Sequence, residues 1–145
     1  MCGIAGFYGH GNKLILDKMI SKISYRGPDQ KQFYLDNKVG LGHNRLSIID
    51  KNSYPQMLHN EKASIWISCN GEIYNYKELK KDLIKRHSFK TNIDTEIIIH
   101  LYEDYGTEAF NMLNGMFAFA IYDKTKRKII LVRDKAGEKP LYWGV

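Results

Sequence analysis

The chain has 145 residues, of which 43% are hydrophobic and 26% are charged, with twelve glycines and three prolines. This length and composition are typical of a single folded domain and exclude a disordered or fibrous protein. The formal net charge of +6 comes from lysines and arginines spread along the chain, and without a recognised binding motif such a charge does not indicate a nucleic-acid partner.

Strand and helix patterns begin at the amino terminus. Residues 3–8 are short, apolar and bounded by glycine, which predicts a buried strand. Apolar residues at helical spacing predict a helix over residues 12–24. The Arg-Gly-Pro-Asp sequence at residues 26–29 should end this helix, because glycine and proline favour a turn there.

A hairpin is predicted next. Its two strands span residues 32–35 and 39–49, and residues 36–38 form the turn between them. Residues 50–64 are polar and indicate a loop.

The central region combines one more strand with two helices. Residues 65–68 alternate apolar and polar side chains, which predicts a strand. This strand leads into Asn70-Gly71, a dipeptide that favours a turn with positive φ. Helical spacing of apolar residues then predicts helices over residues 76–86 and 95–105.

The last third is predicted to be mainly β-structure. A shorter helix over residues 108–113 precedes strands over residues 116–122, 128–133 and 141–143. The alternation of strand runs with helix runs indicates an α+β layered domain.

Targeting segments and disulfides are not indicated. No apolar run reaches the roughly 18 residues that a membrane-spanning helix needs, and the first residues lack the basic region of a signal peptide. We therefore expect a cytoplasmic protein without a membrane partner. Cys2 and Cys69 are far apart in sequence and lack the spacing of zinc ligands, so they are predicted to be free thiols.

Cys2 is the first candidate for chemistry. Removal of Met1 would place a thiol and a free α-amine on the same residue. An α-amine has a reference pKa of about 7.7 to 8.0, close enough to neutrality to accept and return a proton, so Cys2 could supply a nucleophile and its base. Taken alone, a cysteine at this position is more often an inert residue at a chain start.

A series of motifs in fixed order strengthens this candidate. The motifs are C-G-I-A-G at 2–6, R-G-P-D at 26–29, R-L-S-I-I-D at 45–50, N-G-E-I-Y-N at 70–75, D-T-E at 94–96, G-M-F-A-F-A-I-Y-D at 115–123, R-D at 133–134 and P-L-Y at 140–142. This series resembles the class II glutamine amidotransferases, which are amino-terminal-nucleophile hydrolases, and within them it is most similar to the glutaminase domain of asparagine synthetase.

The resemblance implies a fold and a domain organisation. Its fold is a four-layer αββα sandwich of the amino-terminal-nucleophile hydrolase type, in which the nucleophile leads a central strand. Residues 1–145 would form a type-2 glutamine amidotransferase domain, truncated at Val145 before the last strands of the family's sheet. The ATP-dependent synthetase domain is expected to be absent, because no S-G-G-x-D-S motif occurs.

The resemblance also implies how glutamine binds. Arg45 would pair with the α-carboxylate through its planar fork of donors, which lysine cannot reproduce. Asp94 would bind the α-ammonium, with Glu72 nearby. The remaining wall of the pocket would be the backbone of Leu46, Ser47, Ile48 and Ile49 and of Gly71 and Glu72.

Catalysis would depend on Cys2 and on the Asn70-Gly71 pair. The side-chain amide of Asn70 and the backbone N–H of Gly71 would form the oxyanion hole, to which glycine brings close approach and unusual dihedral angles. Alone, Asn-Gly is more often a hairpin turn, Arg45 more often a surface residue, and Asp94 more often a helix cap. These simpler interpretations do not explain why all of these motifs occur in one chain in this order.

Other residues keep simpler interpretations or depart from the family. Cys69 is expected to be a buried strand thiol and His43 a structural residue. The R-G-P-D segment is interpreted as a loop that folds over glutamine, with a plain turn as the alternative. Tyr25 replaces a second arginine, and Tyr54-Pro55-Gln56-Met57 departs from the family's Q-P pair.

The function implied is hydrolysis of the L-glutamine side-chain amide, supplying ammonia to an ATP-dependent synthetase domain or subunit that converts aspartate to asparagine. No cofactor is expected in this domain, whereas ATP and Mg²⁺ belong to the synthetase domain. Two alternatives stay open: the same glutaminase feeding an acceptor in a polysaccharide pathway, and a non-catalytic glutamine-binding remnant. The oligomeric state is also open, with a homodimer among the alternatives.

Overall fold

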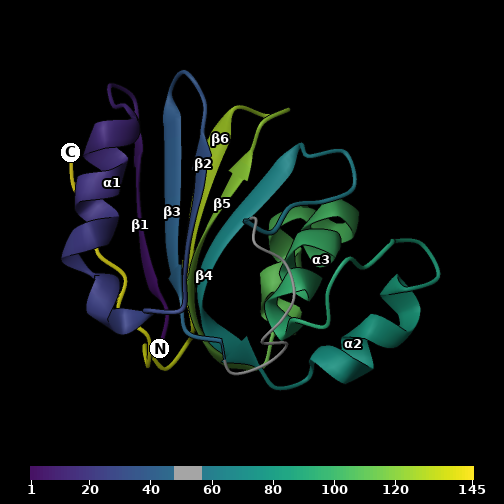
Figure 1. Ribbon diagram of the computed structural model, residues 1–145. Helices are drawn as coiled ribbons and strands as arrows, with labels where there is room; N and C mark the ends of the chain where they lie inside the picture. Colours follow the sequence, from purple (N-terminus) through teal and green to yellow (C-terminus); the bar gives the residue numbers. More distant parts are fainter. Residues whose placement is uncertain (48–56) are drawn as a thin grey trace.

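Four layers make up the structure, in the order helix, sheet, sheet, helix (Figure 1). The computed structural model describes residues 1–47 and 57–145. The layer order is the αββα arrangement that the sequence analysis expects. Within the described residues, no helix is long and apolar enough to cross a membrane.

The amino-terminal half forms one sheet and its covering helix. Strands β1 (Gly3–Tyr8), β2 (Gln30–Leu35) and β3 (Val39–Arg45) form an antiparallel sheet in the order β1-β3-β2. Helix α1 (Lys13–Lys22) covers its outer face (Figure 1) and buries Leu16 and Ile20 there. The side chain of Asn12 caps the helix by accepting a hydrogen bond from the backbone N–H of Ile15 at 3.0 Å.

The second sheet comes from the carboxyl-terminal part of the chain. Strands β4 (Ile65–Ile73), β5 (Gly115–Asp123) and β6 (Lys128–Arg133) are antiparallel in that order. Helices α2 (Tyr76–Leu83) and α3 (Ile97–Tyr105) lie on its outer side (Figure 1). Short 3-10 helices are η1 (Ser24–Arg26), η2 (Asp94–Glu96) and η3 (Gly106–Met112).

The side chains of β4 alternate between two hydrophobic cores. Trp66 and Ser68 face the first sheet: the Trp66 ring lies 4.4 Å from that of Tyr34, and Ser68 Oγ donates to Gly42 O at 2.9 Å. Ile65, Ile67, Cys69 and Ile73 face the helices and belong to the larger core. This alternation places Asn70 on the side of the first sheet, where β1 begins.

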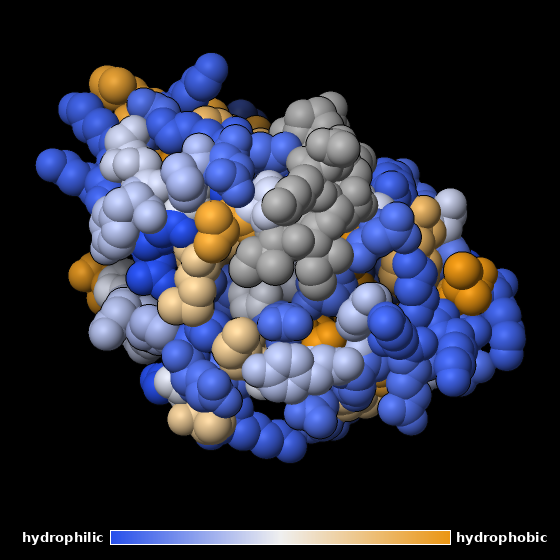
Figure 2. Space-filling view, turned by 60° about the horizontal axis from the view of Figure 1, so that its bottom comes forward, coloured by the Kyte–Doolittle hydropathy of each residue, from blue (hydrophilic) through white to orange (hydrophobic). Residues whose placement is uncertain are grey.

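The outer surface is mainly polar. On the face that Figure 2 shows, hydrophilic residues predominate and hydrophobic residues are scattered, apart from the grey residues. Single exposed hydrophobic residues of this kind are ordinary on a folded domain.

The predicted turn at Asn70-Gly71 is wrong. Both residues lie inside β4, paired with Ala118 and Phe117 of β5. Gly71 is not among the glycines with positive φ. Nine consecutive pairs between β4 and β5 outweigh the local turn preference of the dipeptide.

Several predicted boundaries also differ from the structure. Strand β3 ends at Arg45, so Leu46 and Ser47 are not in the strand, while Ile48 and Ile49 lie outside the described residues. Helix α2 ends at Leu83, its only buried residue, rather than at Arg86. The helix predicted over residues 108–113 is the 3-10 helix η3.

The strand predicted over residues 141–143 does not form. Tyr142 and Trp143 are 89% and 79% exposed, and no described strand pairs with them. Their aromatic character favours a strand only where a neighbouring strand accepts the hydrogen bonds.

Candidate active site

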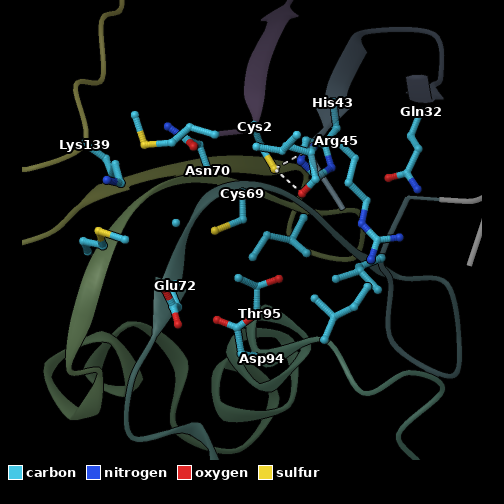
Figure 3. Close-up of a pocket in the computed structure, with 17 residues that line it drawn as sticks. Cys2, Gln32, His43, Arg45, Cys69, Asn70, Glu72, Asp94, Thr95 and Lys139 are labelled. Carbon is cyan, nitrogen blue, oxygen red and sulfur yellow. Dashed lines mark hydrogen bonds between the residues drawn. The ribbon is translucent and has the colours of Figure 1, made fainter. Parts of the chain in front are cut away.

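A cavity of about 120 Å³ opens where the two sheets meet the helical layer (Figure 3). Most of the residues that the sequence predicts for the site line it, although they come from four separate segments. These residues are Cys2, Arg45, Leu46, Asn70, Gly71, Glu72 and Asp94. Ser47 is not among the lining residues, and Ile48 and Ile49 lie outside the described part of the chain.

Cys2 is held at the cavity by the residues around the end of β3. Its Sγ accepts a hydrogen bond from Leu46 N at 3.5 Å and lies 4.0 Å from Leu46 O. Arg26 Nε donates to Cys2 O at 3.2 Å. Because β1 begins at the next residue and pairs Gly3 with Asn44, the first sheet fixes the direction in which Cys2 enters the cavity.

The R-G-P-D segment contacts the same region of the chain. Asp29 N donates to Arg45 O at 3.1 Å, and Asp29 Oδ2 accepts from Ser47 N at 2.6 Å. These contacts fasten the segment to the end of β3. The expectation that this segment folds over bound glutamine stays a prediction.

The edge of β4 that faces away from β5 borders the cavity. Ile67 N donates to Leu58 O at 3.0 Å and Ile73 N donates to Asp94 Oδ2 at 2.6 Å, both away from β5. Backbone direction alternates along a strand, so the N–H of Gly71 points to this same edge. The backbone of Phe117, opposite Gly71, is engaged on its other side by Asp134.

Gly71 also lets β4 and β5 approach closely. A Cβ on this residue would lie 2.3 Å from Met116 O and 2.6 Å from the Phe117 Cα. No side chain can occupy that space, so a residue without a Cβ is required for packing rather than for an unusual φ.

The charged side chains of Asp94 and Arg45 lie at separate points of the cavity. Cys2 and Asn70 occupy one end of it and Asp94 the other, with Arg45 to one side (Figure 3). The Arg45 side chain is 5% exposed and its Nη1 donates to Gln30 Oε1 at 3.2 Å. An ammonium and a carboxylate on one small ligand could therefore find opposite charges in different directions.

Asp94 carries an unfavourable charge in this site. Burial and the nearby carboxylate of Glu72 raise its pKa, although the hydrogen bond from Ile73 N opposes them. A ligand cation beside Asp94 would relieve this cost by replacing the lost hydration with an ion pair.

The two cysteines differ in reactivity. Cys69 is buried in β4, as expected, and burial together with the nearby charges of Asp94 and Cys2 raises its pKa well above the ordinary thiol value. A protonated, buried thiol is a poor nucleophile, whereas Cys2 is partly exposed.

Several lining residues were not predicted from the sequence. Lys139 is buried at 6% exposure and reaches the cavity from the segment after β6, on the side opposite Arg45 (Figure 3). Gln32, Thr95 and Met116 also line the cavity. A lysine in a loop is usually exposed, so there was no reason from the sequence to place Lys139 in the site. Its position directly before the P-L-Y motif was the one available signal.

His43 lines the cavity but is uncharged near neutral pH. Burial and the adjacent charge of Arg45 lower its pKa to about 4. Its Nε2 has no hydrogen-bond partner among the described residues. The structural role expected for His43 stays a prediction.

The whole chain matches a known family of sequences. The profile described as a glutamine amidotransferase domain matches residues 1–145. The chain is 47% identical to asparagine synthetase [glutamine-hydrolyzing] 2 of Bacillus subtilis, with 99% of this chain and 20% of that protein aligned. It is 41% identical to asparagine synthetase [glutamine-hydrolyzing] 2 of Oryza sativa subsp. japonica, covering 99% of this chain and 25% of the relative.

A solved structure shares the fold. Glutamine phosphoribosylpyrophosphate amidotransferase from Bacillus subtilis superposes with a TM-score of 0.69 at 20% identity, covering 94% of this chain and 38% of that one. This likeness confirms the expected fold class. The chain spans about a fifth to a quarter of the length of the curated relatives named above.

Proposed function

Because the chain belongs to the glutamine amidotransferase domain family, we propose that it hydrolyses the side-chain amide of L-glutamine with Cys2 as the nucleophile. The observation that carries this proposal is that Cys2 lines the same cavity as Asn70 and Gly71 of β4. Asn70 and Gly71 lie 68 and 69 positions after Cys2 in the sequence, so only the fold brings the three residues together.

The first half of the reaction forms a thioester. Once Met1 has been removed, the α-amine of Cys2 accepts the thiol proton and the Sγ lone pair attacks the amide carbon of glutamine. The carbonyl π-electrons move to oxygen, where the Asn70 side chain and the Gly71 N–H stabilise the negative charge. The intermediate collapses, the carbon–nitrogen bond breaks, and the proton held by the α-amine leaves with ammonia.

The second half regenerates the enzyme. The α-amine removes a proton from water, and the resulting hydroxide attacks the thioester carbon. A second oxyanion forms in the same hole and collapses by breaking the carbon–sulfur bond. Glutamate leaves, and the Cys2 sulfur recovers its proton.

Substrate selection depends on the charges away from the nucleophile. Arg45 pairs with the α-carboxylate of glutamine and Asp94 with its α-ammonium, while Glu72 adds negative charge near the ammonium. The backbone at Leu46 forms part of the wall, and Ser47, Ile48 and Ile49 are proposed to continue it. The raised pKa of Asp94 supports this role, because binding a cation there offsets the cost of its buried charge.

A covalent label tests the nucleophile. Incubation with a glutamine-mimicking electrophile should add one inhibitor mass to Cys2, located by peptide mass mapping, and only in chains that have lost Met1. Cys69→Ser should be labelled like the unchanged chain and Cys2→Ser should not. Labelling of Cys69, or equal labelling of chains that keep Met1, would contradict the assignment.

We propose further that the ammonia goes to an ATP-dependent module that converts aspartate to asparagine, with ATP and Mg²⁺ bound by that module. The names of the relatives support this acceptor. With the domain joined to such a module, ¹⁵N from the glutamine amide should appear in asparagine by mass spectrometry. Label recovered only as free ammonia, or in an amino sugar, would exclude the acceptor while leaving the Cys2 chemistry intact.

A further inference from the structure

A second cluster of polar side chains lies outside the candidate active site, in the helical layer. Glu61 precedes β4, His87 follows α2, and His100 and Glu103 belong to α3. One nitrogen or oxygen atom from each of these four residues lies within 4.8 Å of the others. None of the four lines the cavity around Cys2.

The spacing of these atoms approaches that of the ligands around a small tetrahedral ion. Glu103 Oε2 lies 3.3 Å from His100 Nδ1 and 3.6 Å from His87 Nδ1. The two carboxylate oxygens of Glu61 lie 3.9 Å from His87 Nδ1 and His100 Nδ1, respectively. Zinc–ligand bonds of about 2.0–2.2 Å place the corners of a tetrahedron about 3.3–3.6 Å apart. The four ligand atoms lie within 4.8 Å of one another, so binding an ion must draw the more widely spaced atoms together.

The histidines are oriented with their Nδ1 atoms toward the cluster. His87 Nε2 lies 3.0 Å from Asp104 Oδ1, a contact that favours a proton on Nε2 and leaves Nδ1 as the free lone pair. His100 is 1% exposed, and its Nε2 has no hydrogen-bond partner among the described residues, with Glu96 Oε1 at 3.8 Å. A carboxylate beyond the outer nitrogen is the usual support of a metal-binding histidine.

The carboxylates are held in the same way. Asn60 Nδ2 donates to Glu103 Oε1 at 2.8 Å, which turns the other oxygen toward the histidines. Ser88 N donates to Glu61 Oε1 at 2.7 Å. The side chains of Glu61 and Glu103 are 34% and 20% exposed, so an ion can enter from solvent.

A proton is the competing cation at this cluster. Burial disfavours a charge on His100, but the carboxylates of Glu96, Glu61 and Glu103 outweigh it and raise the pKa of His100. A charged histidine carries one positive charge, whereas the cluster contains two carboxylates, Glu61 and Glu103. The two carboxylates together carry two negative charges and the neutral imidazoles carry none. A divalent ion balances these two charges, whereas one proton balances only one.

We propose that Glu61, His87, His100 and Glu103 form a structural site for one Zn²⁺ ion. Two imidazoles and two carboxylates suit Zn²⁺, and they leave the complex without net charge. The ion would join the segment before β4, the turn after α2 and helix α3. Helix α2 has the most to gain, because Leu83 is its only buried residue.

Calorimetric titration of the tag-free 145-residue chain with ZnCl₂ tests the site. The titration uses a Cys2→Ser background, so that the partly exposed thiol cannot bind the metal. We expect one equivalent to bind and the melting temperature to rise by about 5–10 °C at a hundredfold excess over Kd. Co²⁺ should give the intense visible bands of tetrahedral coordination without the ultraviolet charge-transfer band of a thiolate.

Matched variants separate this site from adventitious binding. His87→Gln and Glu61→Gln should each lose most of the affinity, and Asp104→Asn should weaken it by about tenfold through loss of support for His87. His10→Gln, the same change at an exposed histidine, should bind like the background chain. Circular dichroism without metal establishes that each variant is folded.

Two results would overturn the proposal. One is the absence of saturable Zn²⁺ binding to the folded background chain, which would make the cluster a proton-binding network alone. The other is equal affinity in His87→Gln, Glu61→Gln and His10→Gln, which would place the ion elsewhere.

Discussion

In the proposed mechanism, Gly71 serves both packing and chemistry. Its missing Cβ allows β5 to approach, because a methyl group there would overlap Met116 O. Its N–H points away from β5 to the cavity edge that Cys2 also reaches. Strand pairing orients this N–H before any substrate arrives, which is the preorganisation that the proposed oxyanion hole requires.

Asn70 is proposed to contribute the second donor, and its removal should slow catalysis without unfolding the domain. Asn70→Ala is expected to lower kcat for ammonia release by about 10²- to 10³-fold, the usual effect of losing one oxyanion donor. A coupled assay for glutamate measures it. Asn37→Ala, at an exposed turn, is the control. Unchanged turnover in Asn70→Ala would remove this residue from the mechanism.

At the scale of secondary structure elements, Asp134 joins β5 to the segment that carries Lys139. Its Oδ2 accepts hydrogen bonds from Phe117 N at 3.2 Å and Lys139 N at 3.0 Å, and its Oδ1 accepts one from Glu138 N at 2.9 Å. Burial disfavours the charge of Asp134, but these backbone donors outweigh it and lower its pKa. The segment after β6 is thereby fixed beside the cavity.

Replacing Asp134 should destabilise the domain in a pH-dependent way. Asp134→Ala leaves buried N–H groups without an acceptor and is expected to lower the free energy of unfolding by about 1–3 kcal/mol near neutral pH. Because the folded-state pKa is lowered, this contribution exists above the unfolded pKa and disappears as pH falls through the folded one.

Urea denaturation at several pH values measures this effect. The difference between Asp134→Ala and the unchanged chain should shrink toward acid pH. Asp82→Ala, at an exposed ion pair with Lys85, serves as the control and should change stability little. A difference for Asp134→Ala that stays constant from pH 7 to acid would disprove the role of its charge.

At the scale of the whole molecule, two cores hold the four layers together. One lies between the sheets and contains Leu41, Met57 and Tyr122. The larger one lies between the second sheet and the helices, with Phe119 fully buried against Phe110 and Phe117. Strand β4 contributes side chains to both, so the two cores should unfold together.

Truncation of Phe119 tests this coupling. Phe119→Ala should lower the free energy of unfolding by about 3–5 kcal/mol, since it leaves a cavity in the larger core. Fluorescence of Trp66, which faces the other core, should shift its urea midpoint as much as circular dichroism does. Separate midpoints would mean that the layers unfold independently. Tyr8→Ala, at a 58% exposed ring, is the control.

The sequence alone was sufficient where local patterns and packing agree. Residues 3–8 and 128–133 form β1 and β6 with the predicted bounds, because apolar side chains and flanking turn residues favour the same conformation that the sheets require. The motifs also identified the family, and with it the fold class and the candidate nucleophile. Residue chemistry by itself favoured an inert residue at Cys2 over a nucleophile.

Tertiary structure decided everything that depends on distant neighbours. Pairing with β5 turned Asn70-Gly71 from an expected turn into strand, and the lack of a neighbouring described strand left Tyr142 and Trp143 without regular structure. Lys139 became a cavity residue only because Asp134 anchors its segment. The histidine–carboxylate cluster joins residues up to 42 positions apart, from Glu61 to Glu103, and long-range contacts of this kind leave no periodic trace in a sequence.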